Sequence, residues 1–252
     1  MNPFGIDVAD LTFHYERHSQ NVVDHVSFRI EPGSITGLLG RNGSGKSTVA
    51  QKIVQALGDD AVLVPMDGFH LAQEELIRLG RRDRMGAPDT FDVTGFASLL
   101  GRLRRRDEDV VYAPRFDRSI ELPIAGAIAI PRDVPLIITE GNYLLHDGEG
   151  WQAVAPLLDT TWYVEVPRSL REERLMARRI AHGDAPDHSA QWVRTVDARN
   201  AQTVERTREL ADAVLERGRG MTSKSLAAST LPRLDPSVAV PDYDRRAGEQ
   251  QI

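Results

Sequence analysis

The sequence has no cysteine, only three lysines and no long apolar run. The absence of cysteine excludes disulfides, thiolate nucleophiles and cysteine-based zinc sites, and it leaves the redox compartment open. No apolar stretch approaches the length that spans a bilayer, and the acidic, polar N-terminus does not resemble a signal peptide. We therefore expect a cytoplasmic protein with no membrane insertion.

Charge and length narrow the class further. The formal net charge is −6, which argues against a general nucleic-acid binder, so we expect no nucleic acid among its partners. A chain of 252 residues with 41% hydrophobic content is long enough for one large domain with a small appendage. The basic residues are nearly all arginine, with lysine only at Lys46, Lys52 and Lys224.

One stretch, residues 40–48, fits the phosphate-loop pattern, with Gly40, Gly45, Lys46 and Ser47 on its fixed positions. An apolar run before it predicts a strand, and helical spacing after it predicts a helix. Glycines let backbone N–H groups turn toward phosphate oxygens, and the helix N-terminus adds further donors. Lysine would reach the β- and γ-phosphates of ATP, and serine would ligate Mg²⁺. We expect the nucleotide to bind Gly40, Asn42, Gly43, Ser44, Gly45, Lys46, Ser47 and Thr48.

The residues before this loop predict antiparallel strands. Residues 11–15 and 26–33, followed by the loop itself, resemble the opening of an ABC-type ATPase. In that family the aromatic residue at the position of Tyr15 stacks on adenine. The resemblance ends there, because no Leu-Ser-Gly-Gly-Gln signature and no apolar strand ending in Asp-Glu follow. Tyr15 is therefore either an adenine contact or a strand aromatic that packs on the core.

From residue 61 onward the motifs are different. A short strand over 61–65 precedes Met66-Asp67-Gly68-Phe69-His70, residues 112–118 read Tyr-Ala-Pro-Arg-Phe-Asp-Arg, and a strand over 136–139 ends in Glu140-Gly141-Asn142. Together with residues 82–92, these pieces resemble the uridine kinase, phosphoribulokinase and bacterial pantothenate kinase group of P-loop kinases. The resemblance covers about residues 35–215 and is nearest to the nucleoside/nucleotide kinase-like branch.

The resemblance implies roles for individual residues. Asp67 matches the general base that activates the acceptor hydroxyl, and Glu140 supports Mg²⁺ together with Ser47. Without the resemblance, Asp67 would be read as a cap of the following turn or helix, and Glu140 is often just a solvated strand end. The acceptor is expected to contact two loops, near 81–92 and 112–118. The residues implied for it are Asp67, His70, Arg82, Arg115 and Asp117.

A helix after the strand over 160–166 carries Arg171, Arg174 and Arg178 on one face. Such a stripe is usually solvated. In the kinases that this chain resembles, however, the same helix leads a lid, here near 168–188, whose arginines close on the triphosphate. Arg174 and Arg178 join Lys46 and Asp67 as expected catalytic residues, and Arg171 is left undecided.

Several features receive a structural interpretation or none. Thr94 is expected to cap the helix over 95–105, while Asp92 and Asp117 stay open between capping and acceptor binding. His182 is read as part of a helix stop, and the seven histidines show no metal-ligand spacing. Residues 189–215 predict one long helix, in which the segment 197–200 has no assigned role.

The sequence therefore predicts a P-loop NTPase of the α/β class, with a doubly wound, mostly parallel sheet and helices on both faces. Residues 1–33 would form an antiparallel β appendage, 34–217 the kinase domain and 218–252 a flexible tail. The expected activity is ATP- and Mg²⁺-dependent phosphorylation of a small metabolite's hydroxyl. The alternatives are the ATP-hydrolysing subunit of an ABC-type transporter and a nucleotide sensor without turnover. Related kinases commonly self-associate, so a homodimer is a further expectation.

Overall fold

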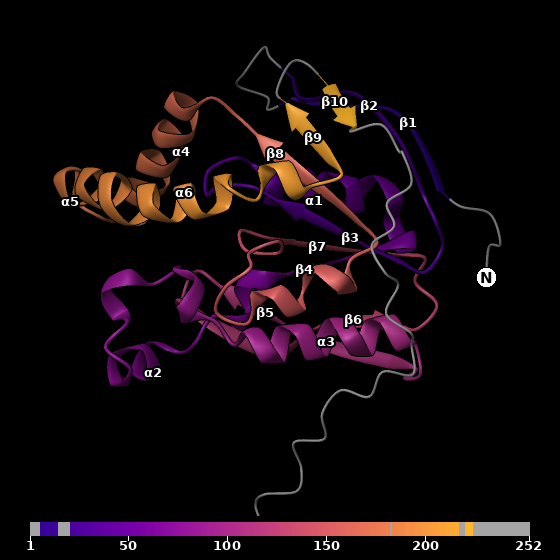
Figure 1. Cartoon of the computed structure of the whole chain (residues 1–252), viewed down its shortest axis with the longest axis horizontal. Coiled ribbons are helices and arrows are strands. Elements are labelled where there is room, and N and C mark those ends of the chain that lie inside the picture. The colour runs from indigo at the N-terminus through magenta and orange to yellow at the C-terminus, as the bar shows by residue number, and fades with distance from the viewer. Residues whose placement is uncertain (1–5, 15–20, 182, 217–219, 224–252) are drawn as a thin grey trace, which may run out of the picture.

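The computed structural model describes residues 6–14, 21–181, 183–216 and 220–223. Its centre is a six-stranded sheet in the order β10-β9-β8-β3-β7-β4 (Figure 1). These strands are β3 (Ser34–Leu39), β4 (Ala61–Pro65), β7 (Leu136–Gly141), β8 (Thr160–Glu165), β9 (Ala213–Glu216) and β10 (Gly220–Ser223). All neighbours pair in parallel except β9 and β10. The predicted mostly parallel sheet is confirmed.

Helices cover both faces of this sheet because its buried strands are apolar on both sides. Leu38 packs on one face with α1 (Lys46–Leu57), in a core that also holds Val49 and Ile53. Ile35 and Leu39 point to the opposite face and pack in a second core with α3 (Val93–Arg105). Alternate residues of β3 thus serve two separate hydrophobic cores, as a doubly wound sheet requires.

Two small antiparallel sheets complete the described strands. The first pairs β1 (Ile6–His14) with β2 (Asn21–Ile30), which agrees with the strands expected before the phosphate loop. The second is a hairpin of β5 (Val110–Asp117) and β6 (Leu122–Pro131). The sequence had suggested a loop over 112–118, and that prediction is wrong. Residues of β6 are almost uniformly apolar, so this strand shows no alternation that a pattern search would detect.

The C-terminal part of the kinase domain also differs from expectation. The long helix predicted over 189–215 is divided into α5 (Pro186–Trp192), a π-helical segment (Val193–Asp197) and α6 (Ala198–Glu205). The chain then enters β9, whose apolar residues are too short a run to distinguish a strand from a helix by pattern. Gly220–Ser223 form β10, and the rest of the predicted tail lies outside the described residues.

The start of α3 corrects a further prediction. Asp92, and not Thr94, is the N-cap residue, and its carboxylate accepts a hydrogen bond from the Gly95 amide at 2.8 Å. This bond satisfies one of the backbone donors that a helix N-terminus leaves without an internal partner. Capping therefore accounts for Asp92, one of the two aspartates that the sequence left undecided.

Candidate active site

The phosphate loop connects β3 to α1 at the carboxyl edge of the sheet. Gly43 and Gly45 have φ values of +80° and +93°, which other residues adopt only with strain. A Cβ atom on Gly43 would also lie 2.9 Å from the carbonyl oxygen of Arg171. No side chain caps the start of α1. The helix begins with open backbone amides, as an anion-binding loop requires.

Lys46, Ser47 and Glu140 converge at the base of this loop. The Ser47 hydroxyl donates to Glu140 Oε1 at 3.0 Å, and Lys46 Nζ lies 3.6 Å from Glu140 Oε2. Glu140 is at the end of β7, directly beside β3. Burial raises the pKa of the Glu140 carboxyl, while the positive charge of Lys46 opposes this shift. The three side chains come from a contiguous loop and the adjacent strand.

Asp67 reaches the same space from the next strand along. It lies in a short 3₁₀ turn, Met66–Phe69, that follows β4. Its carbonyl oxygen accepts hydrogen bonds from the His70 amide and is 2.8 Å from His70 Nδ1. The Asp67 carboxylate forms an ion pair with Arg118, with Oδ2 at 3.0 Å from Arg118 Nη2. The carboxylate that was expected to meet the acceptor therefore pairs with Arg118, and Asp67 lines the same cleft as Lys46 and Ser47.

The charges around Asp67 favour its ionised form. Burial by itself raises the pKa of this carboxyl, although 28% of its side chain is exposed toward the cleft. Electrostatic interactions with nearby groups outweigh that effect and hold the pKa of Asp67 below its ordinary value; in decreasing order these groups are His70, Lys46, Arg118 and Arg178. Asp67 is consequently an anion at neutral pH and is able to accept a proton.

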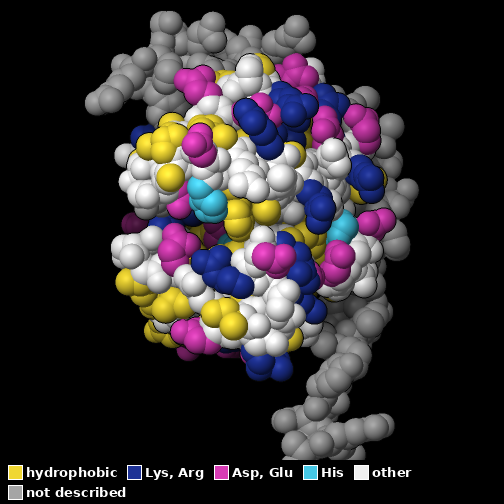
Figure 2. All heavy atoms as spheres, turned by 90° about the vertical axis from the view of Figure 1, so that its left-hand side faces the viewer, with side chains coloured by type: hydrophobic (Ala, Val, Ile, Leu, Met, Phe, Trp, Pro, Cys, Tyr) yellow, Lys and Arg dark blue, Asp and Glu magenta, His cyan; other side chains and the backbone are white. Residues whose placement is uncertain are grey.

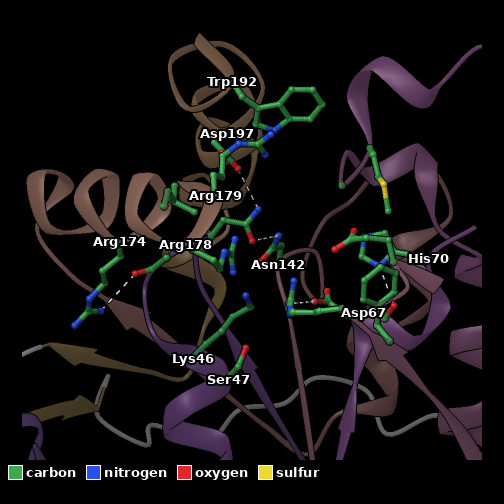
Figure 3. Close-up of a pocket in the computed structure, with 18 of the residues that line it drawn as sticks. Lys46, Ser47, Asp67, His70, Asn142, Arg174, Arg178, Arg179, Trp192 and Asp197 are labelled. Atoms are coloured by element: carbon green, nitrogen blue, oxygen red, sulfur yellow. Dashed lines mark hydrogen bonds and ion pairs between the residues drawn. The ribbon is translucent and has the colours of Figure 1, made fainter. Parts of the chain in front are cut away.

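These groups line one cleft of about 1620 Å³. It opens on the face shown in Figure 2, where basic, acidic and histidine side chains surround a hollow. Figure 3 shows Lys46 and Ser47 at its base, Asp67 and His70 on one side, and the lid arginines on the other. The lining residues from the phosphate loop are Asn42, Gly43, Gly45, Lys46, Ser47 and Thr48.

Helix α4 (Arg168–Ala181), which was expected to lead a lid, places two of the three arginines on its predicted stripe, Arg174 and Arg178, in the cleft. Arg174 Nη1 lies 3.4 Å from the carbonyl oxygens of Gly43 and Ser44. Arg178 is open to the cleft farther along the helix. Arg171, which the sequence left undecided, is buried against the phosphate loop at 2% exposure and does not line the cleft. His182 lies outside the described residues.

The residues expected to bind the acceptor are only partly brought together. His70 and Arg82 line the cleft, but Arg115 and Asp117 do not. The Asp117 carboxylate accepts hydrogen bonds from the amide and hydroxyl of Ser119, so it stabilises its own turn. Phe116 and Arg118, between and beyond these two positions, line the cleft instead. The strand geometry of β5, which the sequence analysis missed, explains this alternation.

Sequence reasoning also missed a polar network, mostly buried, that lines the cleft beside the phosphate loop. Asn142 donates to the side chain of Asn42 at 2.9 Å, and Asn42 donates to Asp197 at 3.4 Å. Asp197 ends the π-helical segment, a conformation that is rare and frequent at functional sites. The only signal for Asn142 is its position two residues after Glu140. Tyr15, expected at the adenine, lies outside the described residues.

The loop over 81–92, which was expected to contact the acceptor, is held by hydrogen bonds from other parts of the chain. The Tyr143 hydroxyl donates to the Gly86 carbonyl at 2.6 Å, and Asn200 donates to the same oxygen at 3.3 Å. The indole of Trp151 donates to the Pro88 carbonyl at 3.0 Å. Buried side chains from distant parts of the chain thus hold this loop in place.

The geometry defines a P-loop phosphotransferase: a phosphate cradle, a carboxylate beside its lysine and serine, and a second carboxylate, that of Asp67, in the same cleft. Among the residues that the structure describes, no helix is both long and apolar enough to cross a lipid bilayer.

Comparisons with known proteins give the family. The chain is 33% identical to a Schizosaccharomyces pombe protein provisionally assigned as a uridine kinase, over 76% of this chain and 86% of that protein. It is 34% identical to the solved structure of a protein provisionally assigned as a fructose transport system kinase in Silicibacter, with a TM-score of 0.63 and coverage of 77% and 88%. The circularly permuted YFH7 of Saccharomyces cerevisiae, 17% identical with a TM-score of 0.60 and coverage of 74% and 93%, shares the fold. The chain belongs to the uridine kinase-like family of ATP-dependent P-loop kinases.

The likeness to ABC-type ATPases is confined to one part of the chain. The profile of the family described as ABC transporter matches residues 23–86, which contain the phosphate loop. Both resemblances seen in the sequence are therefore confirmed, and the kinase resemblance extends over most of the chain.

Proposed function

We propose that this kinase transfers the γ-phosphoryl group of ATP to a hydroxyl of a small metabolite, with Asp67 as general base. One observation supports the assignment: Asp67 lines the same cleft as Lys46, whose positive charge helps to lower the pKa of the Asp67 carboxyl. A base in that position takes the hydroxyl proton as the oxygen attacks phosphorus. Lys46, Arg174 and Arg178 would neutralise the charge that spreads over the phosphoryl oxygens.

We also propose Mg²⁺ as cofactor, held by Ser47 and Glu140. A hydroxyl and a carboxylate oxygen 3.0 Å apart are a donor set that suits this hard cation. Within the described ranges no group of three or more histidine, cysteine or acidic side chains converges. That fits an ion that takes few protein ligands and completes its shell with phosphate and water. When bound, Mg²⁺ would neutralise charge on the β- and γ-phosphates.

The acceptor site lies between the 81–92 loop and the β5–β6 hairpin. His70 lies between the rings of Phe91 and Phe116, with centroids 4.1 and 4.9 Å away, so it is held in place beside Asp67. Arg82 is exposed at the rim, where it donates to Gln73 at 3.2 Å. We propose that His70 and Arg82 contact the acceptor. Because ATP is supplied inside cells, we place the reaction in the cytoplasm; a homodimer is part of the same proposal.

A screen of acceptors tests the function. The protein is incubated with ATP, Mg²⁺ and one acceptor at a time, and products are detected by mass. The panel contains uridine, cytidine, fructose, glycerate and pantothenate. We expect one class of acceptor to gain one phosphoryl group.

The match over residues 23–86 favours a second candidate, an energy-coupling ATPase. That activity would release inorganic phosphate with every acceptor and form no phosphorylated product. Steady ATP hydrolysis of this kind would contradict the kinase proposal.

A further inference from the structure

We infer that Arg118 is a catalytic residue contributed by the β5–β6 hairpin, and that it contacts the phosphoryl group during transfer. The inference rests on the proposed function. Arg118 follows directly after β5, lines the cleft and places Nη2 at 3.0 Å from Asp67 Oδ2. The proposed base contacts the acceptor oxygen that it deprotonates, and this oxygen attacks the phosphorus. A side chain that contacts the base is therefore also close to the phosphoryl group.

Contacts on the hairpin hold the guanidinium in this position. It lies 5.9 Å from the centroid of the Phe116 ring, so a cation–π contact supports the ion pair with Asp67. Phe116 in turn packs beside His70 at 4.9 Å. Half of the Arg118 side chain is exposed, at 49%, on the side of the cleft. The guanidinium therefore presents N–H donors to a ligand as well as to Asp67.

Cations from three elements converge on this point. Lys46 comes from α1, Arg178 from the lid and Arg118 from the hairpin, and all three act on the Asp67 carboxylate. Arg178 lines the same cleft. Burial and, next to it, the positive charge of Arg118 lower the pKa of the Arg178 guanidinium, which indicates that the two guanidinium groups are close to each other. A transferring phosphoryl group spreads negative charge over three oxygens and is best stabilised by cations on several sides.

The step is a displacement at phosphorus. The acceptor oxygen forms a bond to the γ-phosphorus, and the bond from that phosphorus to the β–γ bridging oxygen breaks. The bonding electron pair leaves with ADP, and the hydroxyl proton passes to Asp67. As Arg118 moves its hydrogen bond from Asp67 to the phosphoryl oxygens, the carboxylate becomes a better proton acceptor.

Arg115 provides a matched control. It lies in β5, three residues before Arg118, is exposed and does not line the cleft. The variants Arg118→Gln and Arg115→Gln remove the same charge from the same hairpin. Only Arg118→Gln removes a positive charge that is proposed to lie beside the reacting atoms.

The main experiment measures binding of a transition-state mimic to the full chain by calorimetry, with ADP, Mg²⁺ and aluminium fluoride. We expect Arg118→Gln to weaken the affinity for ADP–aluminium fluoride by about 100-fold, the order found when one transition-state donor is removed. Its affinity for ADP alone should stay unchanged, and Arg115→Gln should match the wild type in both. Arg118→Lys, which keeps the charge but loses the fork, should fall between.

Turnover adds a second readout, with the acceptor that the screen identifies. Arg118→Gln should lower kcat by a similar factor and leave the acceptor KM near its wild-type value. Loss confined to the acceptor KM, unchanged affinity for the mimic, or an equal loss in Arg115→Gln would overturn the inference. If wild-type protein phosphorylates no acceptor, the proposed function fails, while the binding experiment still decides the role of Arg118.

Discussion

The two walls of the cleft are built in different ways. The wall proposed for the nucleotide is one continuous segment, β3, the phosphate loop and α1, and Glu140 of the neighbouring strand contacts its Ser47 and Lys46. The acceptor wall combines the turn after β4, the 81–92 loop and the hairpin. Contacts between distant residues hold it together, such as the hydrogen bond from Tyr143 to Gly86.

Under the proposed function, this difference implies that binding of ATP and choice of acceptor depend on separate parts of the molecule. Local sequence determines the first, because glycines at positive φ and a helix start suffice to form a phosphate cradle. Tertiary packing determines the second. Changes in one wall should therefore leave the other wall's ligand largely unaffected, and the predictions below test that separation.

The largest effect is expected from Asp67→Asn. Loss of a positioned base should lower the rate of transfer by about 10²–10⁴-fold while the affinity for ATP stays near that of the wild type. Product formation by mass and ATP binding by calorimetry measure the two quantities. Asp60→Asn, an exposed change before β4, is the control. Near-wild-type turnover would remove Asp67 from the mechanism.

The corresponding change in the nucleotide wall is Lys46→Met. It should lower kcat by roughly 10²–10³-fold, since a preorganised charge at the phosphates is lost. Unlike Asp67→Asn, it should also weaken ATP binding, because Lys46 is proposed to contact the β- and γ-phosphates in the ground state. Equal ATP affinity in the two variants would break the distinction between the walls.

Two glycines allow each wall to be displaced separately. A Cβ atom on Gly68 would collide with the Pro114 carbonyl oxygen, so Gly68→Ala must push the hairpin outward. Gly43→Ala combines a φ of +80° with a contact of 2.9 Å to Arg171. Since small misplacements cost up to about 100-fold, we expect roughly ten-fold rises in the acceptor KM for Gly68→Ala and in the ATP KM for Gly43→Ala. The opposite pattern would contradict the separation.

The smallest effect concerns stability. Tyr143→Phe removes a buried hydrogen bond of 2.6 Å to Gly86 and should lower the free energy of unfolding by about 1 kcal/mol. Thermal unfolding should then shift by roughly 2–4 °C. Tyr112→Phe, at an exposed tyrosine on the hairpin, should change neither quantity. A similar loss in both variants would show that this bond does not hold the acceptor loop.

The sequence predicted the nucleotide wall in detail and the acceptor wall in outline. Ser47 and Lys46 lie beside Glu140 because a local motif and one buried strand suffice to bring them together. The hairpin escaped detection because the uniformly apolar β6 has no period of two. Because β6 was not predicted, the sequence did not distinguish Phe116 and Arg118, which line the cleft, from Arg115 and Asp117, which do not.

The same limit applies to Asp197 and β9. A π-helical segment has no simple sequence pattern, so the contact between Asp197 and Asn42 depends on how the helices pack. β9 is too short for its apolar residues to separate a strand from the end of a helix.

The hairpin is contiguous in sequence and forms a sheet of its own. Such a unit can be replaced as a whole. Grafting residues 110–131 from one homologue onto another would change part of the proposed acceptor wall and leave the sequence of the phosphate loop unchanged. Acceptor specificity within the family can then change through the β5–β6 hairpin alone, while the part of the enzyme proposed to bind ATP stays the same.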